Sequence, residues 1–159
     1  SKRVTIEPVA LGSSPGEATF YLRDHHGASG LYADLGGDAR GTTTVKLDTL
    51  ENLIQRHGAP HYIKIDVEGH ELEVIRGLKT KVPYLSVEYH TDQTDIALKL
   101  SLIEHLSRNA ELSFNILPQG HLHFVWPEFV DSTTLRSAFP GNLTAENMPP
   151  YGDIFIRCD

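Results

Sequence analysis

Three acidic residues, Asp66, Glu68 and Glu71, stand within six positions of one another. Residues 63–67 alternate apolar and charged side chains, a pattern that predicts a strand. Gly69 then breaks this alternation, and the apolar residues after it recur at the spacing of a helix face. The sequence therefore places Asp66 and Glu68 at the carboxyl end of a strand, where ligands bind in open α/β sheets.

Carboxylates in this position can do two kinds of chemistry. They can align a reacting group and take its proton, or they can hold a divalent ion through their oxygens. They can also serve the fold alone, because the helix N-terminus favours negative charge and the turn offers N–H groups. A direct role for Asp66 and Glu68 and a capping role both remain open, whereas Glu71 suits a dipole partner best.

Lys64 should share the strand face of Asp66, because side chains two positions apart point the same way. A lone charge inside a covered sheet is costly, so a partner is required. Glu88 on the next strand is the natural candidate, which predicts a Lys64–Glu88 pair. A catalytic lysine is the alternative interpretation.

Histidines provide further candidates. His90 ends the strand after the acidic run and could act as a general base near neutral pH, or be a surface residue at the start of a loop. His121 and His123 alternate along a predicted strand and could chelate a metal, but no third ligand is placed by the sequence. Exposed hairpin histidines are therefore the favoured interpretation, and the pair at 25–26 in a glycine-rich loop stays ambiguous.

The run IKIDVEGHELEVIRG resembles the signature of the FkbM-type methyltransferases, which use S-adenosylmethionine and have a Rossmann-like fold. The matching positions are Lys64, Asp66, Val67, Glu68, Gly69, Glu71 and Gly77. Residues 4–16 resemble the third sheet strand and its turn, residues 45–53 the helix before the signature, and residues 85–90 the strand after it. The resemblance covers roughly residues 4–90.

This resemblance implies an α/β fold of the Rossmann-like class I methyltransferase type, mostly parallel with an antiparallel edge hairpin. It implies that Asp66 lies between cofactor and acceptor, and that Ala10 and Leu11 line the adenine side. The family's glycine-rich cofactor turn and its second-strand acid should lie upstream of Val4. Residues 1–159 are therefore expected to be a partial domain with its N-terminal strands missing, and to bind the cofactor poorly and be inactive alone.

The pattern of elements agrees with one α/β domain. Strands are predicted at residues 4–10, 18–22, 43–47, 62–67, 85–89 and 154–157, and a hairpin joins 112–117 to 121–126. Helices should begin at the caps Asp48 and Asp131, and a long helix should run through residues 96–106. The strands at 4–10 and 62–67 should not be neighbours, because the missing strands belong between them.

Composition argues against some classes of binding partner. The net charge of -7 and the lack of a basic run argue against nucleic-acid and membrane surfaces, and the single Cys158 fits a reducing, cytoplasmic compartment. The expected acceptor, a hydroxyl oxygen on a small molecule or glycan, rests on the family resemblance. Two other readings stay open: a metal-dependent hydrolase using Asp66 and Glu68, and a non-catalytic remnant that serves protein contacts.

Overall fold

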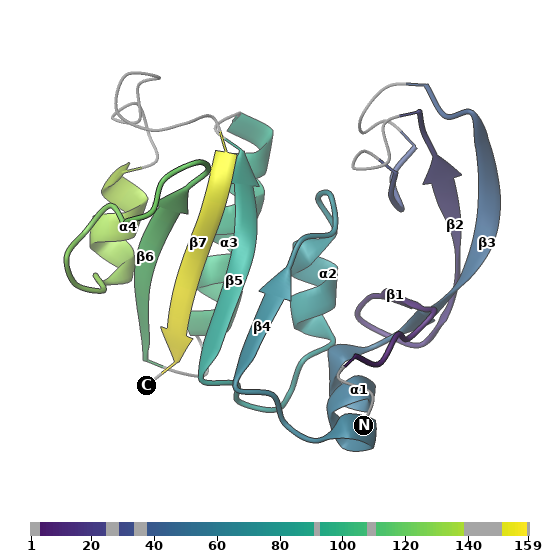
Figure 1. Ribbon diagram of the computed structural model, residues 1–159, viewed down its shortest axis with the longest axis horizontal. Helices are drawn as coiled ribbons and strands as arrows, with labels where there is room; N and C mark the ends of the chain where they lie inside the picture. Colours follow the sequence, from purple (N-terminus) through teal and green to yellow (C-terminus); the bar gives the residue numbers. More distant parts are fainter. Residues whose placement is uncertain are drawn as a thin grey trace. The chain divides into compact units, whose positions relative to one another are not determined.

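The computed structural model describes residues 4–24, 29–33, 38–90, 93–107, 111–138 and 151–158. The chain divides into two compact units, one of Ser1–Gly58 with Glu73–Lys79 and one of Ala59–Leu72 with Thr80–Asp159. Each unit has its own sheet, of three strands in the first and four in the second. In its described part the protein is thus a mixed α/β fold with two sheets and four helices (Figure 1).

The first unit is built on two long antiparallel strands. β2 (Gly16–Leu22) pairs with β3 (Gly41–Asp48) along its whole length, and the two-residue strand β1 (Ala10–Leu11) pairs parallel with the end of β3. The predicted strands at 18–22 and 43–47 are confirmed. Their direct pairing was not foreseen, because a long glycine-rich segment separates them.

The predicted strand at residues 4–10 is wrong, since only Ala10 belongs to β1. Pro8 lacks the N–H group that a ladder requires. Val4 and Ile6 are 72% and 84% exposed, so their apolar side chains pack against no sheet. β1 pairs with β3, and the segments at 4–10 and 62–67 are not paired with each other, as expected.

The N-cap of helix α1 (Leu50–His57) lies one residue later than the expected Asp48. The N-cap is Thr49, whose hydroxyl accepts the Asn52 N–H at 3.1 Å. Asp48 instead accepts from the Asn52 side chain at 2.7 Å and from Arg56 at 2.8 Å. The bond from Asn52 is the main reason that the pKa of Asp48 is lowered. Asp48 therefore links the end of β3 to α1 without capping the helix.

Gly77 follows helix α2 (Glu71–Arg76) and contacts the backbone of Gly12. A Cβ atom at Gly77 would lie 2.2 Å from the Gly12 carbonyl oxygen. The Gly77 carbonyl also accepts the Glu51 N–H at 3.1 Å, at the start of α1. Only glycine fits this close approach, which explains physically why the signature run closes on a glycine.

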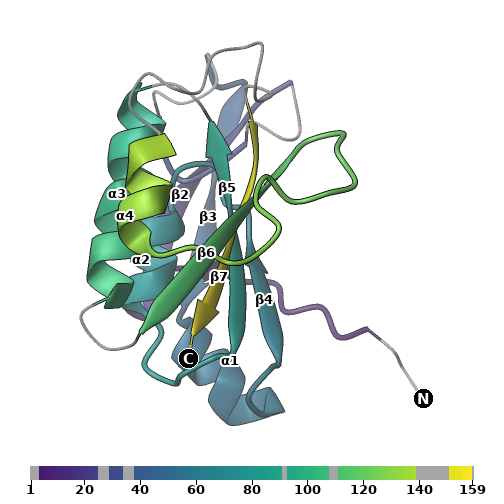
Figure 2. The ribbon, with the colours of Figure 1, turned by 90° about the vertical axis from the view of Figure 1, so that its left-hand side faces the viewer.

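The second unit is a sheet with helices on one face. Its strands lie in the order β4 (Tyr62–Ile65), β5 (Tyr84–His90), β7 (Tyr151–Cys158) and β6 (Leu112–Pro118). Helices α3 (Gln93–Ser107) and α4 (Ser132–Ala138) cover the same face of this sheet (Figure 2). Asp131 caps α4 as expected, accepting the Thr134 N–H at 2.7 Å.

Among the described strands, the expectation of a mostly parallel arrangement is wrong. β4 and β5 are parallel, but β7 runs antiparallel to both β5 and β6, and β2 runs antiparallel to β3. Alternation of strands and helices predicts βαβ units and a largely parallel sheet with an antiparallel hairpin at its edge. In the structure, β7 inserts between β5 and β6 from the end of the chain, which the local pattern could not reveal.

The core of the second unit follows the period of two in its strands. Every second strand residue is buried on the helix-covered face, and the helices add three more side chains. These buried residues are Ile65, Leu85, Val87, Tyr89, Phe114, Ile116, Ile154, Ile156, Leu102, Ile103 and Leu135. The opposite face of the sheet carries polar side chains, among them Lys64, Glu88 and Asp153. The candidate site lies on this face.

The predicted hairpin of residues 112–117 and 121–126 is also wrong. The turn itself exists, because the His121 N–H donates to the Pro118 carbonyl at 3.1 Å. Residues 121–126 then form no strand, and β6 takes β7 as its ladder partner. The returning chain contacts β6 only at points, such as the Val125 N–H on the Ile116 carbonyl at 2.9 Å.

Candidate active site

The acidic run folds as expected into a strand, a tight turn and a helix. β4 ends at Ile65, and the His70 N–H donates to the Val67 carbonyl at 3.4 Å to close the turn. The two central residues have positive φ angles, 52° at Glu68 and 89° at Gly69. Two positive φ angles are typical of a type I′ turn, which favours Asn and Gly. Glu68 is the only non-glycine residue with positive φ in the described chain.

Lys64 lies on the open face of the sheet, but its main partner is not the expected Glu88. Its Nζ is 2.9 Å and 3.1 Å from the two oxygens of Asp153 on β7, and 3.5 Å from Asp66 Oδ2. Burial opposes the lysine's charge, yet these carboxylates outweigh it and raise the pKa of Lys64. The predicted pair was wrong because the sequence did not show that β7 lies beside β5.

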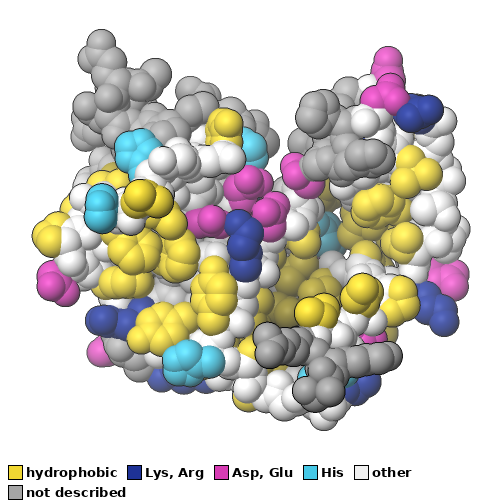
Figure 3. Space-filling view, in the orientation of Figure 1, with side chains coloured by type: hydrophobic (Ala, Val, Ile, Leu, Met, Phe, Trp, Pro, Cys, Tyr) yellow, Lys and Arg dark blue, Asp and Glu magenta, His cyan; other side chains and the backbone are white. Residues whose placement is uncertain are grey.

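Three carboxylates meet at the carboxyl ends of the parallel strands β4 and β5. One oxygen each from Asp66, Glu68 and Glu88 lies within 4.8 Å of the others. Glu88 thus belongs to the site itself, whereas the sequence had assigned it only a structural pairing. Acidic side chains gather beside a basic one on this face of the second unit (Figure 3).

The proximity of these acids changes their protonation. Burial and then the neighbouring charges of Glu88 and Asp66 raise the pKa of Glu68. Burial and the charge of Asp66 likewise raise the pKa of Glu88, although His90 opposes this shift. A raised pKa means that each of these carboxyls keeps its proton to a higher pH than an ordinary glutamate does, which favours a role in general acid–base catalysis.

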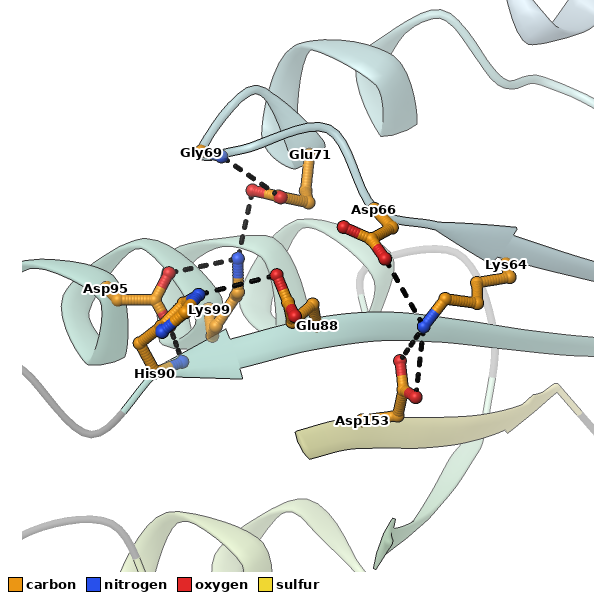
Figure 4. A network of polar contacts seen from close by, with 9 residues as sticks. All are labelled: Lys64, Asp66, Gly69, Glu71, Glu88, His90, Asp95, Lys99 and Asp153. Atoms are coloured by element: carbon orange, nitrogen blue, oxygen red, sulfur yellow. Dashed lines mark hydrogen bonds and ion pairs between the residues drawn. The ribbon is translucent and has the colours of Figure 1, made fainter. Parts of the chain in front are cut away.

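His90 joins the cluster from the end of β5. Its Nε2 is 3.4 Å from Glu88 Oε2, and its ring centroid is 6.1 Å from that of Tyr151. The side chain is exposed, so it is open to a ligand. Of the predicted catalytic residues, the structure therefore brings Asp66, Glu68 and His90 together in one place. Figure 4 shows Asp66 and the contact of His90 with Glu88.

A buried lysine behind the turn was not among the predicted site residues. Lys99 of α3 is 2% exposed and forms an ion pair with Glu71 at 2.9 Å. Two signals could have revealed it. Asp95 stands four positions before it, and Lys99 lies in line with the buried Leu102 and Ile103.

The remaining predicted site residues lie elsewhere or outside the described part. Ala10 and Leu11 are half-buried in β1 of the first unit, whereas the carboxylates belong to the second. His121 and His123 are exposed. Among the described residues, the group that could hold a metal consists of the three acids and no histidine. The histidines at 25–26 lie outside the described residues.

Comparison with known families agrees with this arrangement. The family described as methyltransferase FkbM domain matches residues 2–112, more than half of the 159-residue chain. This match contains β4, the turn and the strand β5 that together carry the acids. No curated protein and no solved structure matches the chain. The family match shows that the chain belongs to the FkbM methyltransferase domain family.

Proposed function

We propose that this protein is an S-adenosylmethionine-dependent methyltransferase that methylates a hydroxyl oxygen on a small molecule or a sugar. Membership of the FkbM family supports the reaction type. The observation that carries the proposal is the meeting of Asp66, Glu68 and Glu88 at the ends of two neighbouring parallel strands. Ligands bind at this edge in open α/β sheets.

The cofactor supplies a methyl group already activated by its sulfonium. The protein then has to align the acceptor and remove its proton. Asp66 is the exposed member of the three acids, at 40%, so it is suited to accept the hydroxyl hydrogen. Glu68 and the His90–Glu88 pair can receive that proton, because both glutamates have raised pKa values.

The charge of the site fits a positive ligand. Asp66, Glu68, Glu88 and Asp153 stand against one lysine on the same face, Lys64. Such a surplus of carboxylates favours a sulfonium or ammonium group over an anion. By the family resemblance, Ala10 and Leu11 would line the adenine of the cofactor.

Three broader features complete the proposal. The parallel β4–β5 pair followed by antiparallel β7 and β6 supports a Rossmann-like methyltransferase sheet. Within the described residues, no helix has the length and apolar character needed to cross a membrane. The single cysteine and the negative charge support a cytoplasmic enzyme that acts on neither nucleic acid nor membrane.

A divalent-metal site is the second candidate, because the three acids offer oxygen ligands of the kind that Mg²⁺ and Ca²⁺ prefer. Such an ion could serve methyl transfer, or it could serve the hydrolysis that this residue set also suits. Titration calorimetry with Mg²⁺ or Mn²⁺ distinguishes these cases when it is combined with the transfer assay described next. Metal binding together with hydrolysis and no methyl transfer would favour the hydrolase.

The proposal is tested by methyl transfer from isotopically labelled S-adenosylmethionine to a panel of sugars and small alcohols. The protein is expressed from the entire coding sequence that contains these residues. We expect label in an ether linkage and release of S-adenosylhomocysteine. Absence of both with every acceptor, and of cofactor binding by calorimetry, would contradict the proposed function.

A further inference from the structure

Lys99 occupies a position that normally belongs to an apolar residue. It lies on the buried stripe of α3 with Leu102 and Ile103 and is 2% exposed. Lysines are almost never fully buried unless they are paired. Apolar side chains can often replace a buried ion pair without loss of stability, so stability alone does not explain this charge.

The partners of Lys99 suggest what it does. Its Nζ lies 2.9 Å from Glu71 Oε2 and 3.1 Å from Asp95 Oδ1. Each carboxylate uses its other oxygen to accept a backbone N–H. Glu71 Oε1 accepts from Gly69 at 3.1 Å, and Asp95 Oδ2 accepts from His90 at 2.5 Å (Figure 4).

These two N–H groups belong to the two segments that carry the site. Gly69 directly follows Glu68 in the turn, and His90 ends the strand that carries Glu88. One buried ammonium group therefore connects both segments through a pair of carboxylates. The turn needs such a constraint, because Glu68 has a positive φ and its carboxylate is close to two like charges.

We propose that Lys99 is a positioning residue that fixes the turn of Glu68 and Gly69 and the end of β5 relative to each other. It acts through Glu71 on the turn and through Asp95 on His90, and so keeps the acids of the site within reach of one another. The consequence for methyl transfer rests on the proposed function. The mechanical role rests on the contacts alone.

Amide hydrogen exchange measured by NMR tests this role without any assay of activity. Lys99→Met removes the charge and keeps an unbranched side chain, and we expect the Gly69 and His90 amides both to exchange about tenfold faster or more. Glu71→Gln should accelerate exchange at Gly69 but not at His90. Asp95→Asn should do the reverse.

Two comparisons make the result decisive. Lys46→Met makes the same substitution at an exposed lysine of β3 and should change neither amide. Equal acceleration of Gly69, His90 and the ladder amides of β6 and β7 would indicate general destabilisation and overturn the proposal. Unchanged exchange at both amides would also overturn it. If Lys99→Met does not fold, the opposite patterns of the two carboxylate variants decide the question.

Kinetics add a second readout on the full enzyme. Misplaced groups in an active site can cost about 100-fold in rate. We therefore expect Lys99→Met to lower kcat by about that factor, with the Kd of the cofactor nearly unchanged. The exchange pattern without methyl transfer in the wild type would overturn only the proposed function. Methyl transfer without the exchange pattern would overturn only the role of Lys99.

Discussion

Glu68 holds a backbone conformation that its side chain does not favour. A positive φ at a residue that is not glycine costs of the order of 1–3 kcal/mol, and such residues cluster at functional sites. Burial and the neighbouring acids add a second cost, which appears as a raised pKa. A residue that serves only the turn would be Asn or Gly, so the position retains a carboxylate at the expense of stability.

Replacing Glu68 by Asn should therefore stabilise the fold while it harms methyl transfer. Asn tolerates positive φ, and we expect a gain of about 1 kcal/mol in the free energy of unfolding relative to Glu68→Gln. Both variants lose the same charge, so the difference between them isolates the backbone effect. Urea denaturation measures it, and equal stability of the two variants would argue against strain at this turn.

The raised pKa of Glu88 makes a prediction about pH. Because the folded protein holds this proton more tightly, the stabilising contribution is complete below the ordinary value of 4.5 and is lost as the pH rises through the raised value. Glu88→Gln imitates the protonated form. It should raise Tm at about pH 7 and change Tm much less at about pH 4.

Thermal unfolding with a chelator present removes any contribution from metal ions to this comparison. Glu104→Gln, an exposed substitution on α3, is the control and should show no such pH dependence. A Glu88→Gln variant that is less stable than wild type at neutral pH would contradict the conclusion that burial and the charge of Asp66 destabilise the ionised form of Glu88.

The position of a single side chain was easier to predict than the residue with which it forms an ion pair. The period of two placed Lys64 and Asp66 on one face, and the structure agrees. The partner of Lys64 was wrong because Asp153 lies 89 positions away in sequence and reaches it through the order of strands. Lys99 was missed for a different reason, because its local signals, Asp95 four positions before it and the buried Leu102 and Ile103, were not used.

Among the elements, the strand, turn and helix that carry the acids could be predicted because their signals are local. Alternation, a glycine and then helical spacing all fall within residues 63–78. The prediction of the hairpin was wrong because the local turn signal does not say which strand pairs with β6. The turn after Pro118 was read correctly, but β6 pairs with β7, which begins at Tyr151.

The junction of α2 with the start of α1 gives a prediction at this scale. Gly77→Ala would put a Cβ atom 2.2 Å from the Gly12 carbonyl, so the backbone must move. Overpacking of this kind costs about 1–3 kcal/mol or more in the free energy of unfolding. Chemical denaturation measures the loss.

Gly16→Ala is the matched control, because a Cβ atom there has no neighbour within 4 Å and the φ angle is not positive. It should change the free energy of unfolding by less than about 0.5 kcal/mol. Similar effects of the two substitutions would mean that the close contact between Gly77 and Gly12 does not exclude a larger side chain at position 77.

At the scale of the whole molecule, the sequence predicted an α/β protein of the FkbM family, and both conclusions are confirmed. A mostly parallel sheet with an antiparallel edge and with its N-terminal strands missing was expected, whereas the described chain has two sheets with antiparallel pairs in each. These antiparallel pairings join segments that are far apart in the sequence, β2 with β3 and β7 with β5 and β6. The spacing of apolar residues within a short segment cannot predict them. Three of the acidic residues, Asp66, Glu68 and Glu88, meet at the ends of β4 and β5.

Asp66→Asn provides the most direct test of the central claim that these acids form a methyltransferase site. Loss of one positioned acid–base group typically lowers the rate by about 100- to 10,000-fold. The fold should survive, because Asp66 is 40% exposed and its contact with Lys64 is a surface pair worth about 0–1 kcal/mol. Cofactor affinity should change less than turnover.

The measurement is turnover of labelled S-adenosylmethionine together with Tm, for wild type, Asp66→Asn and the control Asp38→Asn, which alters an exposed aspartate of the first unit. We expect turnover to collapse only in Asp66→Asn, with Tm nearly constant in all three proteins. Near-normal turnover in Asp66→Asn, with a lowered Tm, would show that Asp66 is a capping acid and would contradict the account.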